Sequence, residues 1–225
     1  ADWADIVRCL KADPLLTEHV ETEPGLRVPG CWEGFELATR AILGQQISVK
    51  GATTIAGRIA ARLGQKLAAP HGLTHLFPTP QVLMNADLAS IGLPQARAES
   101  IRSLARAASQ RQLSFDGIVE TPEFLARLCE IPGIGQWTAQ YVAMRALREP
   151  DAFPCGDLGL LHAAKLTSAS ELSKRSEAWR PWRAYAVMYL WSMHAKNGAG
   201  KVNVRCMESH DEKEKAAGNR QRLKG

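Results

Sequence analysis

Apolar residues recur at steps of three and four along most of the chain, which is the spacing of one face of an α-helix. Two segments show this most clearly, with apolar residues at Val49, Ala52, Ala56, Ile59, Ala60 and Leu63, and at Ala98, Ile101, Leu104, Ala105 and Ala108. No segment alternates apolar and polar residues as a half-buried strand does, and no Asn-Gly dipeptide joins two strand-like runs. The pattern predicts an all-α protein with about ten helices.

Proline and capping residues mark several expected helix starts. Thr79-Pro80 and Thr121-Pro122 each place a capping residue before a proline suited to the first helical position. Pro181 precedes a helix expected over residues 182–194. Glycine, proline and polar residues predict loops near residues 21–30, 68–78, 114–120 and 149–156.

The length of 225 residues suits one domain or two small ones with a real core. We expect one helical domain over residues 1–197, with a subdomain boundary near residues 148–156. The N-terminal helix is expected to pack with the helices of residues 157–197. Residues 198–225 are polar, charged and glycine-containing, which predicts a disordered tail.

Composition narrows the class of protein. Hydrophobic residues make up 45% and charged residues 23% of the chain, as in ordinary globular proteins. No apolar run reaches the roughly 18 residues of a membrane span, and no signal peptide is recognisable. We therefore expect no membrane partner, and a cytoplasmic location in a bacterium or a nuclear one in a eukaryote.

The five cysteines are scattered and form no C-x-x-C pair. This spacing argues against a disulfide framework, a zinc site and an iron–sulfur cluster, and predicts free thiols in a reducing compartment.

The net charge of +5 and the pI near 9.1 are permissive for an anionic partner such as nucleic acid. Residues 196–225 hold eight Lys or Arg and four Asp or Glu, so they supply +4 of this charge. A basic surface on the remainder of the chain would have to come from local clustering.

A proline–glycine turn lies between two expected helices, in the sequence Cys129-Glu-Ile-Pro-Gly-Ile-Gly-Gln136. Gly133 and Gly135 permit positive φ and a close approach of backbone to a ligand. The helix from Gln136 would point its positive end at an anion such as a phosphodiester. An ordinary connection between two helices explains the same residues equally well.

Asp157 stands alone in the segment Phe153-Pro-Cys-Gly-Asp157, directly before an apolar helix. From its position alone, helix capping is the better interpretation. The alternative is a carboxylate that supplies negative charge where a cation develops during a reaction.

Together these segments resemble the helix-hairpin-helix (HhH-GPD) DNA glycosylase superfamily, which combines such a hairpin with a Gly/Pro-rich loop and an Asp. Further matches point to its bacterial-type DNA-3-methyladenine glycosylase II (alkylpurine) branch, over residues 1–197; they lie at Leu26–Cys31 with Phe35, at Arg40–Val49, and from Trp179–Tyr185 to Trp191. The resemblance implies two helical subdomains flanking a DNA-binding cleft.

The resemblance assigns Asp157 as the catalytic carboxylate. A base methylated on a ring nitrogen is already cationic and leaves without protonation, so one carboxylate is enough to stabilise the sugar cation and orient water. Superfamily members that also cleave the strand carry a Lys at the position of Trp137. Without that amine no Schiff base forms, so we expect hydrolysis without lyase activity.

Other roles also follow from the resemblance. It implies a base pocket formed by Trp137, Tyr141 and Trp191, although aromatic residues at helical spacing are usually core residues. We assign Trp179 and Trp182 to the core. The residues implied to contact DNA are Pro132, Gly133, Ile134, Gly135, Thr138, Gln45, Gln46 and Ser48.

Two further details are implied. Gln46 would probe the duplex as a polar wedge, or it is simply part of a polar loop between helices. The backbone carbonyls of Cys129, Ile131 and Ile134 match a monovalent-cation (Na⁺ or K⁺) site, and no organic cofactor is expected.

We therefore expect a monomeric, monofunctional glycosylase that flips and excises alkylated purines, such as 3-methyladenine and 7-methylguanine, from double-stranded DNA in base excision repair. One alternative is a glycosylase for uracil or deaminated bases. A second is a non-catalytic module that binds DNA damage. A third is one domain of a repair fusion protein.

Overall fold

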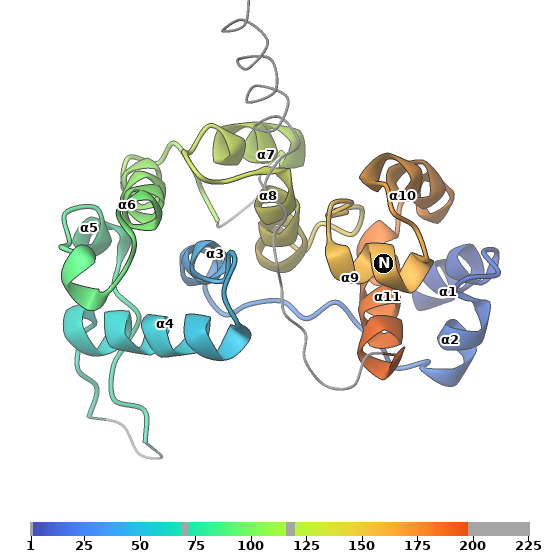
Figure 1. Ribbon diagram of the computed structural model, residues 1–225, viewed down its shortest axis with the longest axis horizontal. Helices are drawn as coiled ribbons and strands as arrows, with labels where there is room; N and C mark the ends of the chain where they lie inside the picture. The colour runs from blue at the N-terminus through green and yellow to red at the C-terminus, as the bar shows by residue number, and fades with distance from the viewer. Residues whose placement is uncertain (1, 69–71, 116–119, 198–225) are drawn as a thin grey trace, which may run out of the picture.

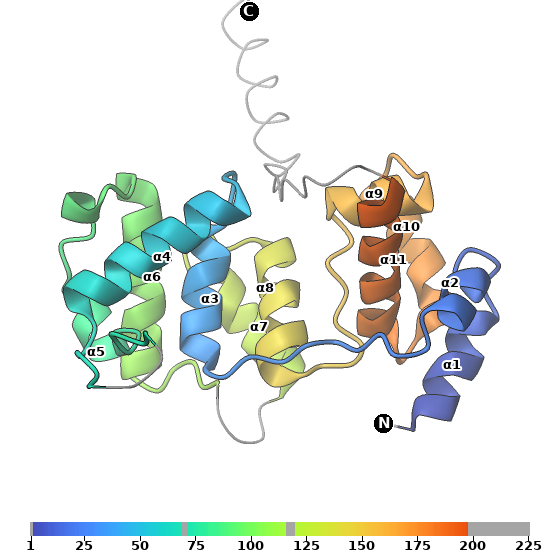
Figure 2. The ribbon, with the colours of Figure 1, turned by 90° about the horizontal axis from the view of Figure 1, so that it is seen from below.

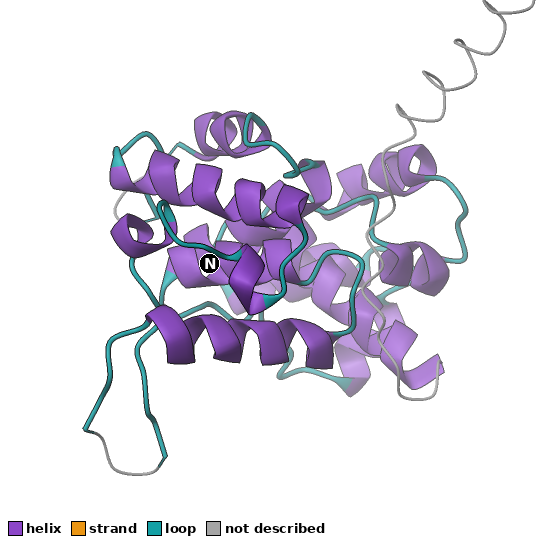
Figure 3. Ribbon diagram, turned by 60° about the vertical axis from the view of Figure 1, so that its left-hand side comes forward, coloured by secondary structure: helices purple, strands orange, loops and turns teal. Residues whose placement is uncertain are grey.

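The computed structural model describes residues 2–68, 72–115 and 120–197. Within these ranges the regular structure is helical, apart from one isolated antiparallel bridge between Lys66 and His75 (Figures 1 and 3). The expected all-α class is confirmed. The α-helices are α1 (Trp3–Lys11), α2 (Thr17–Thr22), α3 (Gly34–Leu43), α4 (Val49–Leu63), α5 (Pro80–Leu83), α6 (Gln95–Ser109), α7 (Thr121–Cys129), α8 (Gln136–Val142), α9 (Leu158–Ala164), α10 (Ala169–Ser176) and α11 (Arg183–Asn197).

Three short helical turns complete the described elements. The turns η1 (Ala89–Ile91) and η3 (Glu177–Trp179) are 3-10 helices, whereas η2 (Ala143–Leu147) is a π-helical turn that continues α8 directly. The predicted disorder of residues 198–225 lies outside the described residues. The four cysteines within them are free thiols, as expected.

The periodic segments fold as the sequence predicts. The starts of α7 and α11 differ from the prediction by one residue each, whereas the start of α5 agrees with it. Helix α5 begins at Pro80 with Thr79 in the capping position. Helix α7 begins one residue earlier than expected, because Glu120 is its N-cap and Thr121 is already helical. The Thr121 hydroxyl instead donates to Glu149 Oε2 at 2.7 Å. Helix α11 begins at Arg183, two residues after Pro181.

Side-chain caps fix the starts of several helices. Asp2, Glu33, Ser48 and Asp157 each accept a hydrogen bond from a backbone N–H in the first turn of α1, α3, α4 and α9 respectively. Such a bond satisfies one of the donors that a helix start leaves without an intrahelical partner.

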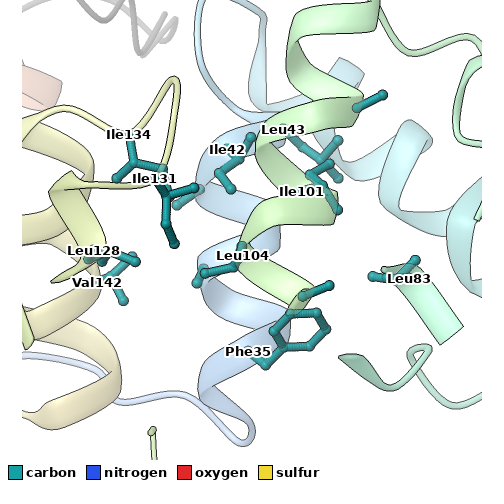
Figure 4. Packing of buried hydrophobic residues seen from close by; sticks show 14 of the residues in the cluster. Phe35, Ile42, Leu43, Leu83, Ile101, Leu104, Leu128, Ile131, Ile134 and Val142 are labelled. Carbon is teal, nitrogen blue, oxygen red and sulfur yellow. The ribbon is translucent and has the colours of Figure 1, made fainter. Parts of the chain in front are cut away.

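The buried side chains form two hydrophobic cores. The first core is built from α3 to α8 and the second from α1, α2, η2, α9, α10 and α11. Figures 1 and 2 show these two groups of helices side by side, with α8 between them. Figure 4 shows the first core, in which Ile101 and Leu104 of α6 face Ile42 of α3 and Leu128 of α7.

The helix α8–η2 belongs to both cores. Val142 is buried in the first core and the next residue, Ala143, in the second, while Tyr141 packs against both. The unbroken helix therefore fixes the position of the second group of helices relative to the first. It ends at Leu147, and its C-cap Arg148 has a left-handed φ of 57°.

Both ends of the described chain meet in the second core. Helix α2 contacts α11, and α1 contacts η3. Glu23, directly after α2, accepts a hydrogen bond from Ser192 at 2.7 Å and pairs with Lys196 at 2.9 Å. From there, residues 24–33 cross to α3 in the first group (Figure 2).

Asp13 fastens the N-terminal helices to the rest of the second core. Its side chain is 9% exposed and accepts hydrogen bonds from Arg175 at 2.6 Å, from the indole of Trp179 at 2.8 Å and from the Leu15 backbone at 2.8 Å. Burial on its own would raise the pKa of Asp13. These hydrogen bonds, with Arg175 foremost, outweigh it and hold the pKa below its usual value.

We expect Asp13→Asn to lower the unfolding free energy at pH 7 by about 2–3 kcal/mol, the weight of hydrogen bonds to a charged group. Because the folded-state pKa is lowered, this stabilisation is complete above the unfolded pKa of about 3.9 and is lost as the pH falls through the folded value. Urea unfolding from pH 7 to pH 3 should show the difference between the two proteins shrinking on the acid side.

Asp5→Asn is the matched control, because Asp5 pairs with Arg8 on the surface of α1. It should cost less than about 1 kcal/mol. Equal losses in the two variants would mean that the Asp13 hydrogen bonds do not fasten the N-terminal helices.

Candidate active site

The hairpin lies where the sequence predicts it. Helix α7 ends at Cys129 and α8 begins at Gln136. Gly133 has a φ of +82°, and a Cβ at this position would lie 2.4 Å from Ser100 Oγ, so any other residue there would be strained. Gly135 does not use the positive φ that glycine permits: its φ is −94° and it is the N-cap of α8. Nothing lies within 4 Å of a Cβ on Gly135, so the backbone there is open to a ligand.

Two buried isoleucines anchor the turn. Ile131 and Ile134 are 7% and 5% exposed and point into the first core, as Figure 4 shows. Pro132, Gly133 and Gly135 are exposed between and beside them. The side chain of Ile134 is used in packing, so only its backbone is available for the DNA contact that the sequence predicts.

Gln45 ties the loop after α3 to the hairpin. Its side-chain amide donates to the Gly133 carbonyl at 2.9 Å and to Thr138 Oγ1 at 3.1 Å. The Arg97 side chain donates in turn to the backbone carbonyl of Gln45 at 2.7 Å. Thr138 is 3% exposed, so its side chain is also unavailable for the DNA contact that the sequence predicts, and only its backbone could make it.

Gln46 and Ser48 lie further along the same loop. Gln46 is exposed and has a left-handed φ of 58°, a conformation that costs a non-glycine residue free energy. Ser48 is exposed and accepts a hydrogen bond from the Gly51 backbone at 3.1 Å, which caps α4. The structure thus brings this loop and the hairpin together.

Asp157 is buried at 7% exposure and does cap its helix, with Oδ1 accepting from the Leu160 backbone at 3.0 Å. It also accepts two further hydrogen bonds. The indole N–H of Trp191 donates to Oδ1 at 3.0 Å and that of Trp137 donates to Oδ2 at 2.8 Å. Capping uses only one carboxylate oxygen, so it does not exclude a role in chemistry.

Of the three aromatic residues proposed from the sequence, Trp137 and Trp191 bond to this carboxylate and Tyr141 packs against both of them. Trp137 and Tyr141 are stacked, with ring centroids 5.4 Å apart and an angle of 5° between the rings. Tyr141 and Trp191 are 6.3 Å apart and tilted by 53°. We call Asp157 and these three residues the Asp157 cluster. Trp179, in contrast, is fully buried and is a core residue as expected.

Two residues near the cluster are absent from the sequence-based set. Arg145 donates to the Tyr141 hydroxyl at 3.2 Å and to the Pro29 carbonyl at 2.5 Å. Gln140 accepts from the Phe153 backbone at 2.9 Å and fastens the loop before Asp157 to α8. Both lie three or four residues from a predicted pocket residue on the same helix, and this spacing was the signal that could have found them.

The resemblance implies a monovalent cation held by the backbone carbonyls of Cys129, Ile131 and Ile134, and oxygen ligands are those that hard cations prefer. In the structure the Ile131 carbonyl accepts a hydrogen bond from the Ile134 N–H at 3.0 Å. Burial raises the pKa of the Cys129 thiol, which keeps the sulfur protonated and unsuited to metal binding. Among the described residues, no group of three or more His, Cys, Asp or Glu could hold a metal ion.

The cluster has the elements needed to stabilise a cation. A carboxylate withdrawn from water acts strongly on a positive charge beside it, and electron-rich ring faces attract a cationic ring. The hairpin beside it offers open backbone at a helix start. A buried carboxylate beside a hairpin of this kind is typical of the helix-hairpin-helix DNA glycosylases that the sequence resembles, in which the hairpin contacts the phosphate backbone of the DNA and the carboxylate acts at a base.

Comparison with known proteins agrees. The family described as "HhH-GPD superfamily base excision DNA repair protein" matches residues 39–181, and the chain belongs to this family. The resemblance inferred from the motifs is therefore confirmed.

Two relatives and one solved structure show the range of similarity. A Mycobacterium tuberculosis protein named "Probable bifunctional transcriptional activator/DNA repair enzyme AlkA" is 41% identical over 197 residues, which cover 85% of this chain and 40% of that protein. The Escherichia coli DNA-3-methyladenine glycosylase 2 is 37% identical over 172 residues, 75% of this chain and 60% of that protein. The chain thus spans about half the length of these relatives.

The structure of a 3-methyladenine DNA glycosylase from Archaeoglobus fulgidus has the same fold. It superimposes with a TM-score of 0.72 at 26% identity, covering 88% of this chain and 72% of that one.

We expect Gly133→Ala to lower the unfolding free energy by about 1–3 kcal/mol, because alanine disfavours the positive φ and its methyl group would meet Ser100. Gly135→Ala is the control, since the space beside Gly135 is open and its φ is negative; at this N-cap position alanine should cost less than about 1 kcal/mol. Denaturant unfolding measures both, and a Gly133→Ala variant as stable as Gly135→Ala would contradict the account of this turn.

Proposed function

We propose that this protein is a monofunctional DNA glycosylase that hydrolyses the N-glycosidic bond of alkylated purines in double-stranded DNA. The observation that carries the proposal is a buried carboxylate, Asp157, bonded to two indoles that both pack against a third aromatic ring, Tyr141. The names of the Escherichia coli and Archaeoglobus relatives support 3-methyladenine as a substrate, with 7-methylguanine as a second base of the same chemistry.

The chemistry needs little more than electrostatics. A purine alkylated on a ring nitrogen is cationic, so it departs with the electrons of the glycosidic bond and becomes a neutral base. The sugar left behind is an oxocarbenium ion, which the Asp157 carboxylate stabilises. Water then adds to the sugar carbon and loses a proton, and Asp157 is positioned to orient that water.

The aromatic residues provide the selectivity. A cationic ring is attracted to the faces of Trp and Tyr more strongly than a neutral ring of the same shape. Trp137, Tyr141 and Trp191 bring rings of this kind together at the Asp157 cluster. The base must leave the helical stack to reach them.

The hairpin provides affinity for DNA in this proposal. The open backbone at Gly135 directly precedes α8, and N–H groups without intrahelical partners at a helix start suit a phosphate. Contacts of this kind carry no base preference. In this proposal Gln46, which is exposed on the adjoining loop, probes the gap that the flipped base leaves.

Strand cleavage is not part of the proposed activity. A lyase of this superfamily uses an amine that attacks the sugar carbon, and Trp137 occupies the position at which the resemblance places that amine. The indole N–H is bonded to Asp157 and is not a nucleophile.

We expect Asp157→Asn to reduce release of 3-methyladenine and 7-methylguanine from methylated duplex DNA by about a hundredfold or more, the effect of removing one preorganised charge-stabilising group. Asn caps helices well, so α9 should keep its start and the protein its stability. Chromatography of the released bases under single-turnover conditions measures the rate.

Asp2→Asn is the matched control, because Asp2 caps α1 far from the cluster in sequence and should leave release unchanged. Borohydride added to the same reactions should trap no protein–DNA adduct. A wild-type protein that binds the DNA and releases neither base would contradict the proposal, and a trapped adduct would contradict the absence of lyase activity.

A further inference from the structure

The two oxygens of Asp157 are held in different ways. Oδ1 accepts from the Leu160 backbone and from Trp191, both at 3.0 Å, so it is fixed by its own helix and by α11. Oδ2 accepts from Trp137 alone among the hydrogen bonds found in the described residues, at 2.8 Å. Oδ1 is thus held by two elements of the second core, whereas Oδ2 is covered by a single side chain of α8.

The Asp157 cluster is closed in this state. Asp157 is only 7% exposed, and the parallel rings of Trp137 and Tyr141 are too close for a flat purine to enter between them. A sugar cation must lie next to a carboxylate oxygen to be stabilised by it. At least one of the groups around Asp157 must therefore move before the reaction.

Trp137 is the group that can move at the smallest cost. Freeing Oδ1 would break two hydrogen bonds and remove the cap of α9. Freeing Oδ2 breaks one hydrogen bond and slides one half-buried ring from the Tyr141 face. Tyr141 itself is held by Arg145, which also bonds to the Pro29 carbonyl, so it stays in place as the remaining wall.

We infer that Trp137 is a gate that determines specificity: its indole N–H masks Oδ2 of Asp157 until a flipped base draws the ring away. The inference rests on the proposed function and deepens it. A cationic base attracts the indole face strongly enough to replace the lost hydrogen bond, whereas a neutral base replaces less of it. Oδ2 is thus exposed to the sugar mainly when the base is alkylated.

The gate assigns different work to the two tryptophans that bond to Asp157. Trp191 is a positioning residue that keeps Oδ1 in place throughout the reaction. Trp137, in contrast, gives up its hydrogen bond to Oδ2 during the reaction. Substitution by Phe removes the indole N–H and keeps an aromatic face, so the same change at the two positions separates the two roles.

The test compares single-turnover release of 7-methylguanine, which is cationic, and hypoxanthine, which is neutral, with enzyme in excess over duplex DNA. Trp137→Phe should release hypoxanthine about tenfold faster than the wild type, because no hydrogen bond to a charged group has to be broken. The preference for 7-methylguanine should fall by a similar factor. Trp191→Phe should slow release of both bases about tenfold and keep their ratio, because it removes one of the hydrogen bonds that hold Oδ1 in place.

Trp179→Phe is the matched control, since it removes an indole hydrogen bond to a different buried carboxylate, Asp13. It should change stability and leave the ratio of the two rates as in the wild type. If Trp137→Phe instead slows release of both bases in the way Trp191→Phe does, both indoles are fixed supports and the gate is wrong. A wild-type protein that releases no 7-methylguanine contradicts the proposed function instead.

A second measurement needs binding only. The indole ¹H–¹⁵N signals of Trp137 and Trp191, assigned with the two Phe variants, are compared between the free protein and its complex with a duplex carrying hydrolysis-resistant 2′-fluoro-7-methylguanosine. The gate predicts that the Trp137 proton moves upfield, toward the position of an indole without a hydrogen bond, while Trp191 stays. A Trp137 signal that stays in place overturns the gate, whatever the catalytic activity.

Discussion

The placement of one carboxylate between two groups of helices is the constraint on which the rest of this structure depends. Trp137 reaches Asp157 from α8, whose buried residues Ala139 and Val142 pack in the first core, and Trp191 reaches it from α11 in the second. A buried charge is costly unless it is hydrogen-bonded, so these donors and the cap of α9 make the position tolerable. The two groups must keep a fixed relation for all three bonds to form.

The unbroken helix α8–η2 supplies that fixed relation. Consecutive residues, Val142 and Ala143, are buried in different cores, so neither group can turn without disturbing the helix that both share. The hairpin starts the same helix, with Gly133 pressed against Ser100 and bonded to Gln45. In the proposed function, the element that would meet the DNA backbone and the element that carries Trp137 are therefore the same short helix.

Local patterns predict much of this fold, and the errors arise where distant contacts decide. The apolar periodicity from Val49 to Leu63 spans the same residues as α4. Both the amphipathic pattern and the Ser48 cap are local features of the sequence. Thr121 resembles a cap, yet Glu149, far along the chain, takes its hydroxyl. The motifs locate Asp157 and the three aromatic residues. The sequence cannot show that two indoles point their N–H groups at the carboxylate, nor that Arg145 reaches back to Pro29.

The central claim is that Asp157 stabilises a cationic sugar. The most direct measurement is the affinity of the protein for duplexes that carry either a cationic pyrrolidine or a neutral tetrahydrofuran in place of the deoxyribose. The account predicts that the pyrrolidine duplex binds about a hundredfold more tightly or better, the lower range for mimics of a transition state, and that Asp157→Asn abolishes the preference. Equal affinity of the wild-type protein for the two duplexes would contradict it.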